Sequence, residues 1–303
     1  MKSLSLKGGI NGNKLTRWWF VLPAMAVVIC LLIYPLISTT VYSFTNRTMI
    51  KPTSHFIGFK NYISIMTDPD FWRAFGHTIL WTLGSVAGQV VVGFIGALCL
   101  NRVRNKIAKN LFRILCIIPW AFPSIATAMT WKWLLNGIYG YVPTLLRNLG
   151  ITQELVQFLS NSKLAMPTMM FINIWFGAPL IMVNVYAALQ TIPRDQYEAA
   201  QIDGASSFQS FIHITAPHIK TVVGLLVVLR TVWVFNNFDL IYMITAGGPA
   251  GSTMTMPLYI YDVGWTGKMV GKASAASILL LLFLVILCIL YFSVLNKWEK
   301  EDK

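Results

Sequence analysis

The chain has 303 residues, of which 56% are hydrophobic and only 12% are charged, and its formal net charge is +13. A soluble domain of this length does not need so much apolar material, so the composition indicates an integral membrane protein. An excess of positive charge also suits nucleic-acid-binding proteins. Here the basic residues lie at the ends of apolar segments and no separate basic domain presents them, so nucleic acid is not an expected partner.

Six apolar segments are long enough, or nearly long enough, to cross a bilayer, which takes about 20 residues. The first is too long for the core of a signal peptide and no cleavage site follows it, so we expect it to be retained. The sequence therefore predicts an all-α integral membrane protein with a transmembrane domain at 18–295 and tails at 1–17 and 296–303. The predicted spans are 18–44, 74–100, 114–135, 165–190, 219–243 and 273–295.

The positions of Lys and Arg predict the orientation of the chain. Short cytoplasmic loops are enriched in these residues, and the densest cluster lies between the second and third spans, in a segment that we expect to be a loop. Both termini and the connection after the fourth span are then cytoplasmic. Trp18, Trp19 and Trp298 are predicted to anchor the first and last spans at the membrane interface. The basic cluster consists of Arg102, Arg104, Lys106, Lys109 and Arg113.

The second span contains small residues that predict close contact with another helix. They are Gly84, Gly88, Gly93 and Gly96. Glycines allow two helix backbones to approach in a membrane, so we interpret them as packing residues rather than as part of a substrate path.

Residues 194–217 form a polar, helix-prone segment on the predicted cytoplasmic side. We expect a short helix over 194–202, a left-handed turn at Gly204, and a second short helix that Ser206 or Ser207 caps and that ends before Pro217. Two short helices joined by a turn make a compact knob that can insert into a partner. The alternative is an amphipathic linker that lies on the membrane surface.

This segment resembles the EAA loop of ABC importer permeases. The pattern of that family is Glu-Ala-Ala, three residues, Gly, nine residues, Ile, one residue and Leu-Pro, and here Ala216 stands where Leu is usual. In the family the loop docks on the ATPase subunit, so the resemblance implies the same for this chain. The residues expected to couple the chain to an ATPase are Glu198, Ala199, Ala200, Asp203, Gly204, Ile214 and Pro217.

Other segments resemble the same family in order and spacing. They are FIGFKNY at 56–62, DPDFWRAFGHTILWT at 68–82, PWAFPSIATAMTWKWLLN at 119–136, and TAGGPAGST at 245–253, which is similar to the Gly-Gly-Pro loop of carbohydrate-type members. The resemblance implies the six-helix type I ABC importer permease fold and a maltose-permease-like sugar importer of carbohydrate uptake subfamily 1. It also implies a location in the cell membrane of a prokaryote.

The implied partners are a second permease subunit that completes a heterodimer, an ABC ATPase dimer, and a periplasmic or extracellular solute-binding protein. The sequence contains no GxxxxGK[ST], HExxH or GxSxG motif. We therefore expect a transport subunit rather than an enzyme, with no catalytic or metal site and no bound cofactor. ATP and Mg²⁺ are expected on the partner ATPase.

Polar residues within the fourth span predict a substrate path, because such residues are costly in a membrane unless they face a pathway or a partner. Asn173, Gly177, Leu180 and Asn184 follow each other at spacings of four, three and four, which places them on one helix face. The alternative is that Asn and Gly serve helix packing.

The fifth span adds a second stripe, made by Arg230, Trp233 and Asn237. Amide and guanidinium groups can bond sugar hydroxyls, and an aromatic face can cover the C–H side of a sugar ring. An alternative role for Arg230 is an ion pair with a carboxylate of a partner. In maltose-type permeases the WxG and NNF regions line the sugar site, which implies the same for Trp175-Phe176-Gly177 and for Asn236-Asn237 here.

These patterns predict the permease subunit of an ATP-driven importer that translocates an oligosaccharide or related carbohydrate delivered by a solute-binding protein. The alternative is a permease of the same fold for glycerol phosphate, an amino acid or another small solute. A secondary transporter has less support, because we find no internal repeat and only Asp239 is an acidic residue at plausible membrane depth.

Overall fold

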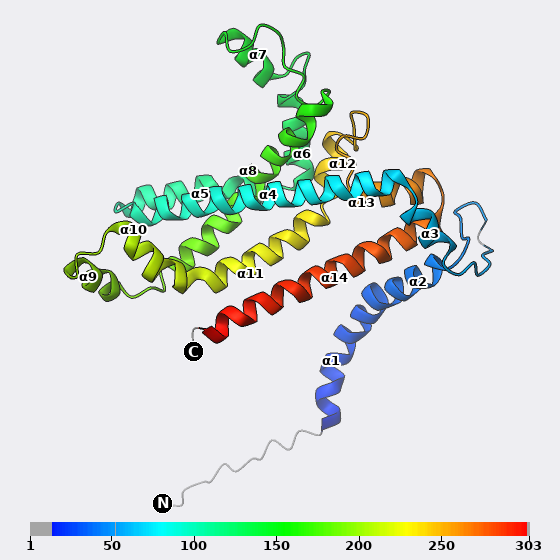
Figure 1. Cartoon of the computed structure of the whole chain (residues 1–303), viewed down its shortest axis with the longest axis horizontal. Helices are drawn as coiled ribbons and strands as arrows, with labels where there is room; N and C mark the ends of the chain where they lie inside the picture. The colour runs from blue at the N-terminus through cyan, green and yellow to red at the C-terminus, as the bar shows by residue number, and fades with distance from the viewer. Residues whose placement is uncertain (1–13, 52, 302–303) are drawn as a thin grey trace, which may run out of the picture. The chain divides into compact units, whose positions relative to one another are not determined.

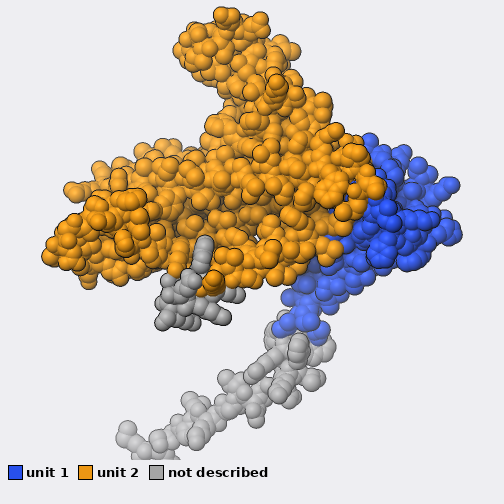
Figure 2. Space-filling view, in the orientation of Figure 1, with its two compact units in different colours: residues 1–65, 263–278 blue, residues 66–262, 279–303 orange. Residues whose placement is uncertain are grey.

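The computed structural model describes residues 14–51 and 53–301 (Figure 1). The side chains at 14–20, 296 and 298–301 lie outside that description, and with them the predicted anchors Trp18, Trp19 and Trp298. The described chain divides into two compact units, which Figure 2 colours separately. The first comprises Met1–Ile65 with Val263–Ile278, and the second comprises Met66–Asp262 with Leu279–Lys303.

The first unit is built around the first apolar segment. Helix α1 (Lys14–Val28), the π-helical turn η1 (Ile29–Ile33) and α2 (Tyr34–Ser43) follow one another, and Val21–Ser43 has the length and composition of a span, as predicted. Asn61 ties the next segment back to α2 by donating hydrogen bonds to the carbonyl oxygens of Ser43 and Thr45, at 2.9 and 2.8 Å. This unit also contains most of α3 (Lys60–Met66) and of η3 (Asp262–Thr266), together with the start of α14 (Val270–Glu301).

The second unit contains the other candidate spans, except for the start of α14. The second, fourth and sixth predicted spans are confirmed as α4 (Pro69–Arg102), α8 (Ser162–Leu189) and α14, whose apolar part is Val270–Leu295. Helices α4, α8 and α11 (Ala216–Phe235) pack against one another. The predicted glycine contact is confirmed, because Gly93 lies so close to the carbonyl oxygen of Ala178 and to Ile181 that an added Cβ would be 2.7 Å from each.

The third predicted span is not one straight helix. It divides into α5 (Lys106–Ala121) and α6 (Ser124–Leu134), which are bent by 93° relative to each other. The break lies at Pro123, because a residue before proline avoids the helical conformation and Phe122 is extended, with ψ 146°. The basic cluster is a loop only at 103–105, which contains Arg104, because α4 ends at Arg102 and α5 begins at Lys106. The other cluster residues lie on these two helices.

The fifth predicted span ends earlier than expected. Helix α11 stops at Phe235, and Asn236 caps it with a side-chain hydrogen bond of 2.9 Å to the carbonyl oxygen of Val232. A separate short helix, α12 (Asp239–Ile244), follows after the break. Asn favours caps because its side chain competes for backbone hydrogen bonds, so the paired Asn residues end the helix that we expected to continue to 243.

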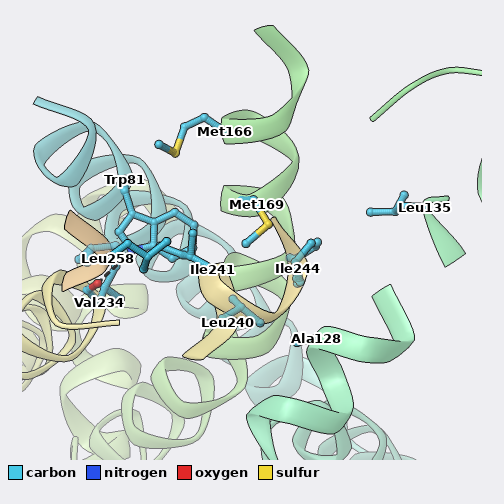
Figure 3. Packing of buried hydrophobic residues seen from close by; sticks show 12 residues of the cluster. Trp81, Ala128, Leu135, Met166, Met169, Val234, Leu240, Ile241, Ile244 and Leu258 are labelled. Carbon is cyan, nitrogen blue, oxygen red and sulfur yellow. Dashed lines mark hydrogen bonds between the residues drawn. The ribbon is translucent and has the colours of Figure 1, made fainter. Parts of the chain in front are cut away.

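A cluster of buried hydrophobic residues holds these broken helices together. Trp81 of α4 is fully buried, and its Nε1 donates a 2.9 Å hydrogen bond to the carbonyl oxygen of Val234 at the end of α11. Figure 3 shows Trp81 beside Val234 and Leu258, which comes from α13 (Met256–Tyr261). The cluster also includes Ala128, Leu135, Met166, Met169, Leu240, Ile241 and Ile244. Packing therefore holds the break between α11 and α12 in place.

Short elements lie at the two ends of the second unit. Helix α7 (Tyr141–Asn148) belongs to the connection between α6 and α8, and the loop 245–253 links α12 to α13. Thr253 closes this loop through a 2.7 Å hydrogen bond from its Oγ1 to the carbonyl oxygen of Gly248. At the opposite end of α11 lie α9 (Arg194–Ile202), α10 (Ser207–Ser210) and the π-helical turn η2 (Phe211–Thr215), as Figure 1 shows.

Candidate functional site

A cavity of about 270 Å³ lies where α8 and α11 meet the two helix breaks. Six of the predicted substrate-path residues line it: Asn173, Phe176, Arg230, Trp233, Asn236 and Asn237. The other lining residues are Trp120, Ser124, Val234, Phe238 and Asp239. The structure therefore brings amide, guanidinium, carboxylate and aromatic groups together around one space.

Two buried amide atoms at this cavity have no hydrogen-bond partner among the described residues. They are Nδ2 of Asn173, a donor, and Oδ1 of Asn237, an acceptor. Asn173 is only 1% exposed, so bulk water does not satisfy it. Because a buried polar atom without a partner is costly, these two side chains have one unused donor and one unused acceptor beside the cavity.

Arg230 is buried, and it is held from within the chain. Its Nε donates a 2.7 Å hydrogen bond to Oε1 of Gln89, and its guanidinium carbon lies 5.8 Å from the ring centre of Trp233. Asp239 lines the same cavity, but the structure gives no ion pair between it and Arg230. No carboxylate among the described residues therefore forms a direct ion pair with the guanidinium.

Four predicted path residues do not line this cavity. Gly177 lies behind it, where an added Cβ would overlap Arg230 and Gln89. Asn184 donates a 2.8 Å hydrogen bond to the carbonyl oxygen of Leu180 within its own helix, and neither residue reaches the cavity. Trp175 instead lines an apolar groove between α4, α5 and α8.

The expected stripe on the fifth span is wrong in its last member. Arg230 and Trp233 lie on α11, but Asn237 lies beyond the end of that helix and reaches the cavity from the break. Sequence reasoning also missed Gln89, Trp120 and Ser124. For Gln89 the available signal was a lone amide in the middle of a long apolar helix. For Trp120 and Ser124 it was the nearby Pro123, which breaks the predicted span.

The segment 194–217 folds largely as predicted. Helix α9 covers Arg194–Ile202, and Gly204 has a φ of +75°, which is the left-handed conformation. The amide N–H of Gly204 bonds the carbonyl oxygen of Gln201 and that of Ala205 bonds the carbonyl oxygen of Ala200, the two bonds of a Schellman helix end. Ser206 then caps α10 in a capping box with Gln209.

The second helix of this segment does not end before Pro217, contrary to the prediction. The π-helical turn η2 precedes that proline, and Ser207–Phe235 continues as one helical stretch into α11. Because proline supplies no N–H, a local change from α- to π-helical hydrogen bonding lets it enter the first turn of α11. Motion of this segment is thereby connected directly to the helix that carries Arg230.

The predicted coupling residues lie on the surface of this knob. Glu198, Ala199, Asp203, Gly204 and Pro217 are exposed, whereas Ala200 and Ile214 are half-buried. Two large apolar side chains beside them are also exposed, Ile202 at 87% and Phe208 at 70%. A hollow of about 340 Å³ lies on this knob, lined by Ala200, Asp203, Gly204, Ala205, Gln209, Ser210, His213 and Ile214. Large exposed apolar side chains such as Ile202 and Phe208 are typical of a surface that receives a partner.

Comparisons with known proteins agree in family and in fold. The family model described as "Binding-protein-dependent transport system inner membrane component" matches residues 89–299. The trehalose/maltose transport system permease protein MalF of Thermococcus litoralis is 34% identical over 90% of this chain and 91% of its own length. The diacetylchitobiose uptake system permease protein DasB of Streptomyces coelicolor is 30% identical over 97% of this chain and 94% of its own length.

A solved structure has the same fold. One chain of a bacterial ABC transporter involved in the import of the acidic polysaccharide alginate matches with a TM-score of 0.83 at 23% identity, covering 93% of this chain and 96% of that chain. The described helices include five that are long and apolar enough to span a membrane, or six if α5 and α6 form one bent span. The expected multi-pass, all-α importer permease fold is confirmed.

Proposed function

The chain belongs to the family of binding-protein-dependent transport system inner membrane components, and from this premise we propose that it is the permease subunit of an ATP-driven carbohydrate importer. The observation that carries the choice of carbohydrate is the pair of unsatisfied amide atoms on Asn173 and Asn237 at one cavity. A sugar hydroxyl both donates and accepts hydrogen bonds, so a polyhydroxylated ligand meets both needs.

The remaining lining groups suit the same ligand. Trp233 is 60% exposed and presents an aromatic surface to the C–H side of a sugar ring, next to the guanidinium of Arg230. The relatives whose names refer to trehalose, maltose and diacetylchitobiose support a disaccharide or longer oligosaccharide. The fold alone suits a permease for other small solutes equally well. The choice of a carbohydrate over such solutes therefore rests on the cavity and on these relatives.

Three kinds of partner complete the proposed machine. A solute-binding protein, which the family description names, delivers the sugar to the outer face at the loops 46–72, 136–163 and 245–253. A second permease forms a heterodimer with this chain in the cell membrane of a prokaryote. A dimer of ABC ATPases holds ATP and Mg²⁺ and docks on the segment 194–217.

In the proposed cycle, ATP binding closes the ATPase dimer and moves the knob formed by α9 and α10. Because Ser207–Phe235 is one helical stretch, this movement reaches Arg230 and Trp233 at the cavity. The permease then changes from an inward-open to an outward-open state, accepts the sugar, and releases it inside after hydrolysis. This is a population shift driven by the binding energy of a partner.

The experiment that tests this proposal is gentle affinity purification of the tagged chain from its native membranes, followed by identification of what copurifies. We expect a second permease, an ATPase and a solute-binding protein, and we expect the last to bind disaccharides in a screen that also contains glycerol phosphate and amino acids. A binding protein that takes only the latter compounds would replace the carbohydrate assignment. Recovery of this chain alone, still able to transport in liposomes without ATP, would overturn the importer assignment.

A further inference from the structure

One buried amide on α4 connects that helix to α8 and α11, the two helices that carry Asn173 and Arg230 at the proposed cavity. Gln89 of α4 is fully buried; its Oε1 accepts the 2.7 Å hydrogen bond from Nε of Arg230, and its Nε2 donates a 2.9 Å hydrogen bond to the carbonyl oxygen of Asn173. Building on the proposed function, we propose that Gln89 is a positioning residue, which holds the guanidinium of Arg230 at the substrate cavity and leaves its positive charge there.

The chemistry of the amide explains why a glutamine suits this position. Its carbonyl end faces a donor and its amino end faces an acceptor, so both polar ends are satisfied in one orientation only. A glutamate would form an ion pair with Arg230 and cancel its charge. A leucine would leave the buried Nε of Arg230 without a partner, which is unfavourable enough to make the side chain move.

Gly177 supplies the space for this arrangement. A Cβ at that position would overlap Nη2 of Arg230 and both Cδ and Nε2 of Gln89. The three residues come from α11, α4 and α8, so each helix contributes one part of the same contact. The absence of a side chain at 177 is therefore part of the mechanism that positions Arg230.

The Nη groups of the guanidinium have no hydrogen-bond partner among the described residues. The structure gives Arg230 no hydrogen bond to a described residue other than the one to Gln89, and Arg230 lines the cavity. Since Gln89 is neutral, the bond orients Arg230 without removing its charge. Gln89 consequently determines both the direction of the remaining N–H donors and the electrostatic potential that a sugar meets.

The charge at the cavity can be measured without knowing the sugar. In the assembled complex, Cys30, Cys99, Cys116 and Cys288 are replaced by Ser, and Asn236→Cys places one reactive thiol on the exposed rim of the cavity. The readout is the ratio of its labelling rates with an anionic and a cationic methanethiosulfonate, the sulfonatoethyl and trimethylammonioethyl reagents. A nearby positive charge raises this ratio.

We expect Arg230→Met and Gln89→Glu to lower the ratio by about threefold or more, since one removes the charge and the other neutralises it. Gln89→Leu should lower it in the same direction by about twofold, because the guanidinium is no longer held at the cavity. Gln190→Leu is the matched control. That glutamine is exposed at the end of α8, where its Nε2 bonds Asn101 at 2.8 Å.

The inference would be overturned if both Gln89 variants had the same labelling ratio as the parent complex. If Gln89→Leu fails to assemble, the labelling ratio of Gln89→Glu decides the case. A second readout is uptake of radiolabelled maltose and trehalose. Adding Gln89→Leu to Arg230→Met should cause no further loss of uptake. An additive loss of uptake would instead mean that Gln89 acts independently of Arg230. Failure of the parent complex to import any saccharide would count against the proposed function, and the labelling ratio would still decide the role of Gln89.

Discussion

The hydroxyl of Tyr197 lies 2.8 Å from Oγ1 of Thr215, and this hydrogen bond joins α9 to the π-helical turn η2 across the loop at Gly204. Thr215 is buried at the base of the knob, and η2 leads without a break into α11. In the proposed importer, a displacement of α9 by the ATPase would therefore be transmitted through this bond to α11, the helix that carries Arg230 and Trp233.

The first prediction is that Tyr197→Phe weakens this route. The variant keeps the ring and loses only the hydrogen bond, which contributes about 0.5–1.5 kcal/mol, so sugar uptake per ATP hydrolysed should fall about two- to tenfold. Uptake and ATPase activity are measured together in proteoliposomes of the complete complex. Tyr34→Phe, at a position that is 67% exposed on α2, is the matched control. Equal coupling in Tyr197→Phe and wild type would mean that the bond has no role in transmission.

The second prediction concerns the turn at Gly204. An added Cβ would meet nothing within 4 Å, so the effect of a substitution comes from the φ of +75° rather than from crowding. Gly204→Val should abolish uptake, since the left-handed conformation costs an ordinary residue about 1–2 kcal/mol and a β-branched one more. Gly204→Asn should retain part of the activity because Asn tolerates this conformation.

The measurement for Gly204 is uptake, together with the affinity of the solute-binding protein for its sugar. That affinity should stay unchanged in every variant, because the soluble protein binds sugar on its own. Glu198→Lys, on the exposed face of α9, should also abolish uptake by placing a positive charge in the proposed docking surface. Wild-type uptake in Gly204→Val or in Glu198→Lys would remove the segment 194–217 from the coupling mechanism.

Local features of this segment were predictable from sequence, because each depends on neighbouring residues. Gly204 ends α9 and Ser206 caps α10 through contacts within a few positions. The prolines were less predictable. Pro123 breaks a span. Pro217 does not break one, because the π-helical turn η2 accommodates it. Which of these outcomes occurs depends on how the surrounding helices pack.

Contacts between distant helices could not be predicted from spacing. Helical periodicity places Arg230 on a face of α11, but it does not say that Gln89, 141 residues earlier, lies opposite. Periodicity likewise places Gly177 on the predicted substrate-path stripe, but it does not reveal that this glycine makes room for the contact between Gln89 and Arg230. The polar side chains indicated where a cavity lies, and only the packed helices indicate which of them line it.

The third prediction separates stability from function at Asn173. Its Nδ2 is buried without a hydrogen-bond partner among the residues that the structure describes, a state that costs about 1–3 kcal/mol. Asn173→Leu removes this cost, so the unfolding temperature of the complex should rise or stay constant while sugar uptake falls strongly. Thermal unfolding and uptake are measured on the same preparation. A variant that imports sugar at the wild-type rate would show that the amide does not contact the substrate.

The fourth prediction tests the aromatic surface of the cavity. Trp233→Ala and Asn237→Ala should each impair uptake while the ATPase still assembles with the permease, because both residues line the cavity far from the segment 194–217. Trp133→Ala is the control for loss of an exposed tryptophan, since that residue is 59% exposed and does not line the cavity. Equal uptake in the Trp133 and Trp233 variants would argue against sugar stacking.

The fifth prediction uses three glycines of α4 that differ in their surroundings. A Cβ at Gly93 would lie 2.7 Å from the backbone oxygen of Ala178, which cannot move without shifting α8, whereas at Gly96 it would meet the flexible side chain of Met182 at 3.1 Å. Gly93→Ala should therefore destabilise the complex by about 1–3 kcal/mol, and Gly96→Ala should have a smaller effect.

Gly76 is the matched control for this series, because an added Cβ there meets nothing within 4 Å. Gly76→Ala should stabilise the helix by about 0.5–1 kcal/mol, since alanine loses less backbone freedom on folding. Denaturation of the three variants in the same detergent measures the order, which we expect to be Gly76→Ala, Gly96→Ala and Gly93→Ala from most to least stable. Equal stability of the Gly76 and Gly93 variants would contradict close packing of α4 on α8. Close packing at Gly93 would then not explain how α4 and α8 come near enough for Gln89 to bond the carbonyl oxygen of Asn173.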